Sequence, residues 1–275
     1  MVIWLKIVTW AAVQLTPEKF YEQSELDDDK IKDLKFPILS SLKEKKTHYE
    51  DFDLIDEGGM KKVFTARETQ TDRVVVYVQP IDSDSDAGVE QFLFEARLTA
   101  YLEHPNIIPV HDVGINPEGL PFFTMKYMKG QTLADILKKL NEEEAEAVQK
   151  YDLDILIEII LRVCDAMTYA HSKGVIHLDI NPANIQVGQH NEILLCDWGL
   201  ARFQSDNIDE WDERGEGLQG RNQSPKRKAG TPGFMSPEQT VQGSALGPTA
   251  DIYAIGAILY KVLTGVTAVS GKNSA

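Results

Sequence analysis

The chain has 275 residues, with 28 Lys and Arg side chains against 43 Asp and Glu, so its formal net charge at pH 7 is −15. A surface that binds nucleic acid needs a surplus of cations to displace counterions from phosphates, so this balance argues against a nucleic-acid partner. Hydrophobic residues make up 43% of the chain and charged residues 26%, which is typical of a folded protein and excludes disorder of the whole chain. Cys164 and Cys196 are too few for a disulfide scaffold, which favours a reducing compartment and makes the cytoplasm the expected location.

Residues 1–50 predict an N-terminal extension or linker. Residues 1–15 are rich in Val, Ile, Trp and Leu, but the run is short for a membrane span and is interrupted by Lys6. Residues 16–49 are strongly charged, as in a solvated linker. We therefore expect no transmembrane span.

The next stretch has the pattern of a β-rich half with one helix. Three short β-prone segments, separated by Gly58-Gly59 and by a polar turn, predict a three-stranded meander, and two further strands follow the helix. The strands are expected at 52–55, 62–67, 73–78, 107–113 and 121–127, and the helix at 87–103.

From Gly130 onward the pattern is mainly helical. Helices are expected at 133–140, 153–171 and 251–263, and the last is apolar on all sides, so it predicts the buried central helix of its lobe. The polar stretch 204–229 predicts a mobile surface loop. The fold class is therefore α+β, with a β-rich lobe before an α-rich lobe.

Four motifs lie in and after the junction of the two halves. They are His177-Leu178-Asp179-Ile180-Asn181-Pro182-Ala183-Asn184, Asp197-Trp198-Gly199, Gly230-Thr231-Pro232 and Ser236-Pro237-Glu238. In this order and spacing they resemble the protein-kinase signature set, and the phrase 230–239 looks most like bacterial Ser/Thr kinases. The resemblance runs from about Phe52 to Gly265 and implies a bilobal fold with an N-lobe at 51–128, a C-lobe at 129–275 and an activation-loop insertion at 204–229.

The resemblance also implies roles for individual residues in phosphoryl transfer from Mg-ATP to a protein substrate. Asp179 would orient or deprotonate the substrate hydroxyl, and Asn184 and Asp197 would hold Mg²⁺. Glu95 would be the carboxylate of the N-lobe helix, and Thr231 the substrate-adjacent threonine of Ser/Thr kinases. The positions implied to contact the nucleotide are Gly58, Val63, Val75, Tyr77, Met125, Tyr127, Met128 and Gln186.

The nucleotide-binding half departs from the family pattern. The three positions of the glycine loop are Asp56, Gly58 and Lys61, so only the middle glycine remains, and Asp56 places a negative charge where phosphates should rest. In the third strand Tyr77 takes the place of the lysine that pairs the phosphates and the helix carboxylate. Val75 and Gln186 alter the apolar slot for the base.

The catalytic loop also lacks expected cations. Asn181 replaces the lysine that steadies the transferred phosphoryl group, and Leu178 replaces the arginine that in many kinases pairs with a phosphate on the activation loop. Because each well-placed cation is worth several kcal/mol at the transition state, we expect transfer to be weak or lost.

Two alternatives remain open for the function. One is a catalytically inactive pseudokinase that acts as a signalling or docking module. The other is an active kinase in which Lys61 reaches the phosphates from the second strand, as the substitute lysine of the with-no-lysine kinases does. The other reading of Lys61 is a solvated lysine at the edge of the strand.

The segment 251–265 is followed in the family by further helices, whereas this chain reaches Ala275 after a short polar stretch. The C-lobe is therefore expected to be incomplete. The apolar segment 252–263 would then expose a large patch unless another segment or a partner covers it.

Overall fold

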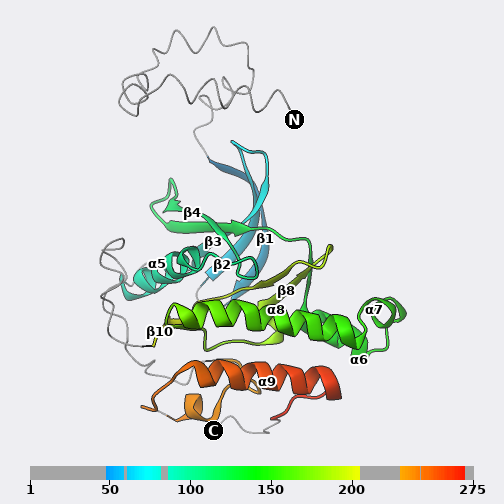
Figure 1. Cartoon of the computed structure of the whole chain (residues 1–275). Helices are drawn as coiled ribbons and strands as arrows, with labels where there is room; N and C mark the ends of the chain where they lie inside the picture. Colours follow the sequence, from blue (N-terminus) through cyan, green and yellow to red (C-terminus); the bar gives the residue numbers. More distant parts are fainter. Residues whose placement is uncertain (1–47, 59–60, 82–85, 205–229, 242, 270–275) are drawn as a thin grey trace, which may run out of the picture. The chain divides into compact units, whose positions relative to one another are not determined.

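The computed structural model describes residues 48–58, 61–81, 86–204, 230–241 and 243–269 (Figure 1). Nearly all of the predicted extension 1–50 and of the predicted loop insertion 204–229 lies outside the described residues. Contacts divide the chain into two compact units, residues 1–50 with 67–73 and residues 51–66 with 74–275. In the first unit the Arg67 guanidinium donates to Glu50 at 2.6 Å and to Asp72 at 2.8 Å. The proposed boundaries at 51–128 and 129–275 stay a prediction.

A five-stranded sheet with the order β1-β2-β3-β5-β4 occupies the first half of the described chain. Its strands are β1 (Tyr49–Gly58), β2 (Lys61–Glu68), β3 (Val74–Pro80), β4 (Val110–Ile115) and β5 (Pro121–Lys126). The three segments of the predicted meander are neighbours in the sheet, which confirms their order. The fourth strand begins at Val110 rather than at Ile107, because Ile107 instead forms an isolated bridge with Leu195.

Helix α5 (Asp86–Tyr101) covers one face of this sheet (Figure 1). The buried cluster between them comprises Val76, Val78, Phe92, Ala96 and Phe123. Because successive side chains of a strand point to opposite faces, Val76 and Val78 on β3 face α5, whereas the residue between them faces away.

The second half is built on α6 (Leu133–Asn141), α8 (Leu153–Ser172) and α9 (Pro248–Thr264), with the short α7 (Ala145–Lys150) between the first two. The Thr132 hydroxyl accepts from the backbone N–H of Asp135 in a capping box that begins α6, and at the start of α8 the Asp152 carboxylate accepts from the backbone N–H of Ile155. Gly265, with φ 76°, ends α9 in the left-handed conformation that glycine adopts without cost.

Short elements missed by sequence reasoning carry the catalytic loop and its surroundings. They are β6 (Gly130–Thr132), β7 (Val175–Ile176), the 3-10 turn Pro182–Asn184, β8 (Ile185–Gly188), β9 (Ile193–Leu195), β10 (Arg202–Phe203) and the 3-10 turn Pro237–Thr240. Strands β6, β8 and β9 form one sheet, and β7 pairs with β10. The fold is therefore the expected α+β arrangement, with a β-rich N-lobe and a helical C-lobe.

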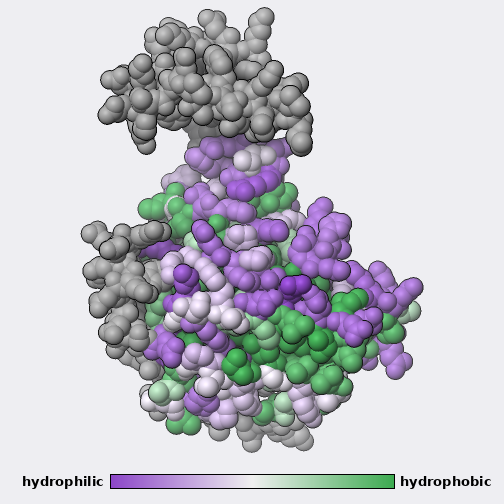
Figure 2. Space-filling view, viewed as in Figure 1, coloured by the Kyte–Doolittle hydropathy of each residue, from purple (hydrophilic) through white to green (hydrophobic). Residues whose placement is uncertain are grey.

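Helix α9 is buried on one side only, which corrects the expectation that it is buried all round. Ala254, Ile255 and Ile258 lie in the main core, whereas Ile252 is 59% and Leu263 57% exposed. The reason is that α9 packs against α8, and its opposite side lacks a covering element among the described residues. Figure 2 shows hydrophobic side chains gathered where α8 and α9 lie side by side. That a partner covers this face stays a prediction.

Within the described ranges, none of the helices combines the length and apolar character needed to cross a membrane.

Candidate functional site

The catalytic loop is fixed to α9 through one buried carboxylate. Asp251 accepts from the backbone N–H groups of His177 at 2.9 Å and of Leu178 at 2.8 Å, and lies 2.8 Å from His171 Nε2. Leu178 takes the left-handed backbone conformation, with φ 66°, which is unfavourable for a bulky side chain. The hydrogen bonds from Asp251 hold the chain in this turn, immediately before Asp179.

Asp179 is surrounded by hydrogen-bond donors. Its Oδ1 atom accepts from the backbone N–H of Thr231 at 2.8 Å and from the Thr231 hydroxyl at 2.7 Å, and its Oδ2 atom accepts from Asn184 Nδ2 at 3.2 Å. Asn181 donates from Nδ2 to Thr231 Oγ1 at 2.9 Å and caps the following 3-10 turn. The structure thus brings Asp179, Asn184 and Thr231 together, with a neutral amide in the place of the expected lysine.

Asp197 lies in a strained turn after β9. Its backbone φ is 58°, and its Oδ1 atom accepts from the N–H of Gly199 at 3.4 Å. Trp198 between them is fully buried, and its ring lies against His177 at a centroid distance of 4.5 Å. Packing of Trp198 therefore anchors the turn that presents Asp197.

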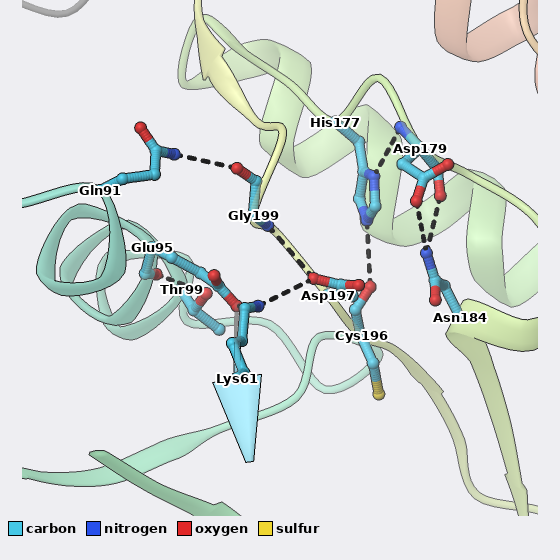
Figure 3. A network of polar contacts seen from close by, with 10 residues as sticks. All are labelled: Lys61, Gln91, Glu95, Thr99, His177, Asp179, Asn184, Cys196, Asp197 and Gly199. Carbon is cyan, nitrogen blue, oxygen red and sulfur yellow. Dashed lines mark hydrogen bonds and ion pairs between the residues drawn. The ribbon is translucent and has the colours of Figure 1, made fainter. Parts of the chain in front are cut away.

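Lys61, on β2, forms the centre of an ion-pair network with both lobes (Figure 3). Its Nζ atom is 2.5 Å from Glu95 Oε1 on α5 and 3.3 Å from Asp197 Oδ1. The Glu95 side chain is 7% exposed and that of Lys61 26%, so both are shielded from solvent. In contrast, the neighbouring Lys62 pairs with Glu57 at 3.3 Å, and both side chains are more exposed. Lys61 is therefore not a solvated edge lysine.

Electrostatics keep the Lys61 ammonium charged. Burial by itself lowers the pKa of Lys61, but the carboxylates of Glu95 and Asp197 outweigh burial and raise the pKa above its ordinary value. A cation therefore stands between the helix carboxylate and Asp197 throughout the neutral range.

The residues at this site fit a magnesium–nucleotide complex, which would bring its own oxygen ligands. Mg²⁺ is usually held by one or two carboxylates together with substrate phosphates, and Asp197 supplies a carboxylate while Asn184 supplies an amide. Asn184 Nδ2 donates to Asp179, so its side-chain oxygen points elsewhere (Figure 3). Among the described residues, no three His, Cys, Asp or Glu side chains converge as a preformed metal cage.

Most of the predicted nucleotide positions lie around the end of the sheet and β8. Gly58 is the last residue of β1, and Val63 packs on the cluster under α5 together with Met125 and Tyr127. Met128 packs against the C-lobe core. Gln186 lies on β8 between the buried Ile185 and Val187, so its half-buried side chain points away from that core.

The structure does not bring Val75 and Tyr77 together with the other positions expected to contact the nucleotide. Tyr77 is buried on the sheet face opposite α5, where its ring stacks on Phe122 at 4.8 Å and meets Phe52 edge-on at 5.0 Å. Burial raises the pKa of Tyr77 to about 12. Val75 shares this face by alternation. The two β3 residues that face α5 and the nucleotide positions are Val76 and Val78.

Sequence reasoning also missed Gln91. Its side-chain Nε2 donates to the carbonyl oxygen of Gly199 at 2.9 Å, so it joins α5 to the turn that carries Asp197 (Figure 3). The available signal was its position one helical turn before Glu95, on the same side of α5.

Leu178 is packed into an apolar cluster with Ile176 and Ala250, and Leu200 and Leu246 lie against it. Apolar side chains therefore surround the position at which many kinases have an arginine.

Comparison with known proteins agrees with this geometry. The sequence model of the protein kinase domain matches residues 49–275. The Serine/threonine-protein kinase PknD of Chlamydia muridarum is 34% identical over 230 residues, which cover 78% of this chain and 24% of that protein. The protein of the same name from Protochlamydia amoebophila is 35% identical over 227 residues, 78% of this chain and 23% of that protein. The chain therefore spans about a quarter of the length of these relatives.

Proposed function

The chain belongs to the protein kinase family, and on that premise we propose that it transfers the γ-phosphoryl group of Mg-ATP to Ser or Thr side chains of a protein substrate, with Lys61 as the lysine that contacts the phosphates. The single observation that carries the proposal is the position of Lys61 Nζ, 2.5 Å from Glu95 and 3.3 Å from Asp197. A cation held between these two carboxylates is suited to anionic phosphate oxygens.

The remaining residues have complementary roles in this proposal. The substrate hydroxyl oxygen forms the new bond to phosphorus, the bond to the leaving ADP oxygen breaks, and Asp179 receives the hydroxyl proton. Thr231, which donates to Asp179 at 2.7 Å, holds that carboxylate in place. Asp197 and Asn184 would hold Mg²⁺, which supplies charge neutralisation at the phosphates when it is bound.

A paired comparison of two adjacent lysines tests the proposal. Lys61→Met should lower phosphorylation of a generic protein substrate by about 100-fold or more, because one preorganised charge contact at a transition state is worth roughly that much. Lys62→Met is the matched control, since Lys62 is the next residue of the same strand and pairs only with Glu57 among the described residues. The measurement is transfer of radiolabel from γ-labelled ATP. Equal activity of the two variants, or no transfer by the wild type, contradicts the proposal.

A pseudokinase that acts as a docking module is the second candidate, and the neutral Asn181 favours it. Asn181 occupies the place of a second phosphate-steadying cation, and its amide is engaged by Thr231 and the Asp179 carbonyl. A thermal-shift titration with ATP, with and without Mg²⁺, separates the candidates, because a ligand that binds only the native state raises its stability. No shift at millimolar ATP favours the docking module.

Substrate and location are proposed in general terms. The partner would be a protein with an accessible Ser or Thr, and the negative net charge supports a partner other than nucleic acid. Cys164 and Cys196 are free thiols, which supports a reducing, cytoplasmic setting.

A further inference from the structure

Gln91 makes a long-range contact that the roles above do not use. Its side chain is half-buried on α5, and its amide donates to the carbonyl oxygen of Gly199, which is 108 residues away in the chain. Gln91 precedes Glu95 by four residues, so both side chains leave the same side of the helix. Helix α5 is therefore joined to the Asp197–Gly199 turn directly through the Gln91 amide, and indirectly through Lys61, which pairs with both Glu95 and Asp197.

The turn depends on such a contact because its backbone is unfavourable. Asp197 has φ 58°, a left-handed conformation that is unfavourable for non-glycine residues and persists where the surrounding structure holds it. The Gly199 N–H donates to the Asp197 carboxylate, and the Gly199 carbonyl accepts from Gln91. The Gln91 amide and the Asp197 carboxylate thus hold the peptide groups on either side of Gly199.

The hydrogen bond from Gln91 to Gly199 also differs from an ion pair that forms only when the activation loop is phosphorylated. Where an arginine precedes the catalytic aspartate, a phosphate on the activation loop can order the site through an ion pair. Here Leu178 fills that position within an apolar cluster. An amide-to-carbonyl hydrogen bond requires no modification to form, so it is present as soon as α5 packs on the turn.

We propose that Gln91 is a positioning residue that holds the Asp197–Gly199 turn against α5 and so orders the site without phosphorylation. The proposal rests on the proposed kinase function for its effect on rate. The contact itself does not require activity.

The test replaces Gln91 by Met in the full chain, which keeps the length of the side chain and its helix propensity but removes the N–H donor. The kcat of Gln91→Met should fall by about tenfold while the KM for the protein substrate stays unchanged. Amide hydrogen exchange of the 196–201 segment should become about tenfold faster, since local opening of the turn becomes easier. Arg97→Met on the exposed side of the same helix is the matched control and should change neither quantity.

The outcomes separate this proposal from the proposed function. With an active wild type, a Gln91→Met variant that leaves either kcat or exchange of the turn unchanged overturns the positioning role. With an inactive wild type the proposed function fails, and the exchange measurement alone decides whether Gln91 holds the turn. Treatment of the wild type with a phosphatase should leave kcat within about twofold, and a tenfold fall overturns ordering without phosphorylation.

Discussion

Both ends of the candidate site lack a lysine at a position where the family pattern has one, and they differ in whether another residue places a cation there. At the nucleotide end, β3 offers only Val76 and Val78 toward α5, yet the cation is present because Lys61 reaches Glu95 from β2. At the catalytic-loop end, Asn181 occupies the position of the second cation and bonds to Thr231 as a neutral amide.

The difference shows what a fold permits when a charged group moves. Strands β2 and β3 are neighbours in one sheet, so we expect a lysine at a suitable position on β3 to reach the carboxylate that Lys61 reaches from β2. The catalytic loop is a single tight turn fixed by Asp251, and Asn181 within it is 4% exposed.

Among the variants that test this comparison, the largest effect is expected when a lysine is placed on β3. In the Lys61→Met background, which we expect to have little activity, the added change Val78→Lys should raise the activity at least tenfold. Val78 faces α5 in one cluster with Phe92 and Ala96, which lie on either side of Glu95 in the helix. The measurement is kcat/KM for ATP with a protein substrate.

The control for this rescue is Tyr77→Lys in the same Lys61→Met background. Tyr77 faces Phe122 and Phe52 on the opposite side of the sheet, so a lysine there should restore nothing. Rescue by Tyr77→Lys and not by Val78→Lys would show that the strand presents its other face to the nucleotide.

Gly199→Ala should have the next largest effect, a loss of about tenfold in kcat/KM. A Cβ atom at Gly199 would lie 3.1 Å from Glu95 Oε2 and 3.2 Å from Asp197 Oδ1, so both carboxylates must shift by a few tenths of an ångström, whereas its 3.4 Å distance to Lys61 Nζ is an ordinary contact. Small displacements of positioning groups are costly to catalysis. Steady-state kinetics at saturating Mg²⁺ check this, and unchanged kinetics would show that the network tolerates the displacement.

Asn181→Lys should raise kcat by about threefold to tenfold, because it adds a cation to the catalytic loop at the position where the chain has a neutral amide. The change removes the hydrogen bond to Thr231, so part of the gain is offset. Measuring the same variant in the Lys61→Met background shows whether the two ends act independently. A fall in kcat in both backgrounds would mean that the amide is required as it stands.

The smallest effect is expected for Tyr77→Phe, which should leave kcat at neutral pH unchanged because Tyr77 lies away from the nucleotide face. Burial raises the Tyr77 pKa to about 12, so above its ordinary pKa of about 10 the unfolded chain loses a proton that the folded chain keeps. The unfolding free energy of the wild type should therefore fall relative to that of Tyr77→Phe as pH rises from about 10 towards 12. Parallel denaturation curves over this range would contradict the assigned burial.

The longer strands and helices of the lobes could be located from the sequence because their periodicity and turn residues are local signals, whereas the two- to four-residue elements around the catalytic loop could not. The sequence did not show which residues of β3 point toward α5. The run Val74-Val75-Val76-Tyr77-Val78 is apolar throughout, so it has no alternation of polar and apolar residues from which a face could be assigned. Sequence reasoning failed on α9 for a related reason, because an apolar helix indicates burial without showing how many sides are covered.

Some site residues could be named from sequence motifs, whereas the contacts of others are visible only in the folded structure. Asp179, Asn184 and Thr231 could be named from their motifs, and the structure brings them together. The partners of Lys61 could not be derived from spacing, since Glu95 is 34 and Asp197 136 residues away and only packing of α5 and the turn unites them. Gln91 carried no motif at all.

The buried Asp251 has a consequence for folding. By accepting from the main chain of His177 and Leu178, it makes the catalytic loop part of the same cooperative unit as α8 and α9. The loop therefore cannot open locally without exposing a buried carboxylate, and it gains the protection against fluctuation that belongs to the helical core. The backbone on which Asp179 stands is therefore held by the C-lobe core, through a carboxylate that lies 73 residues beyond Leu178 in the chain.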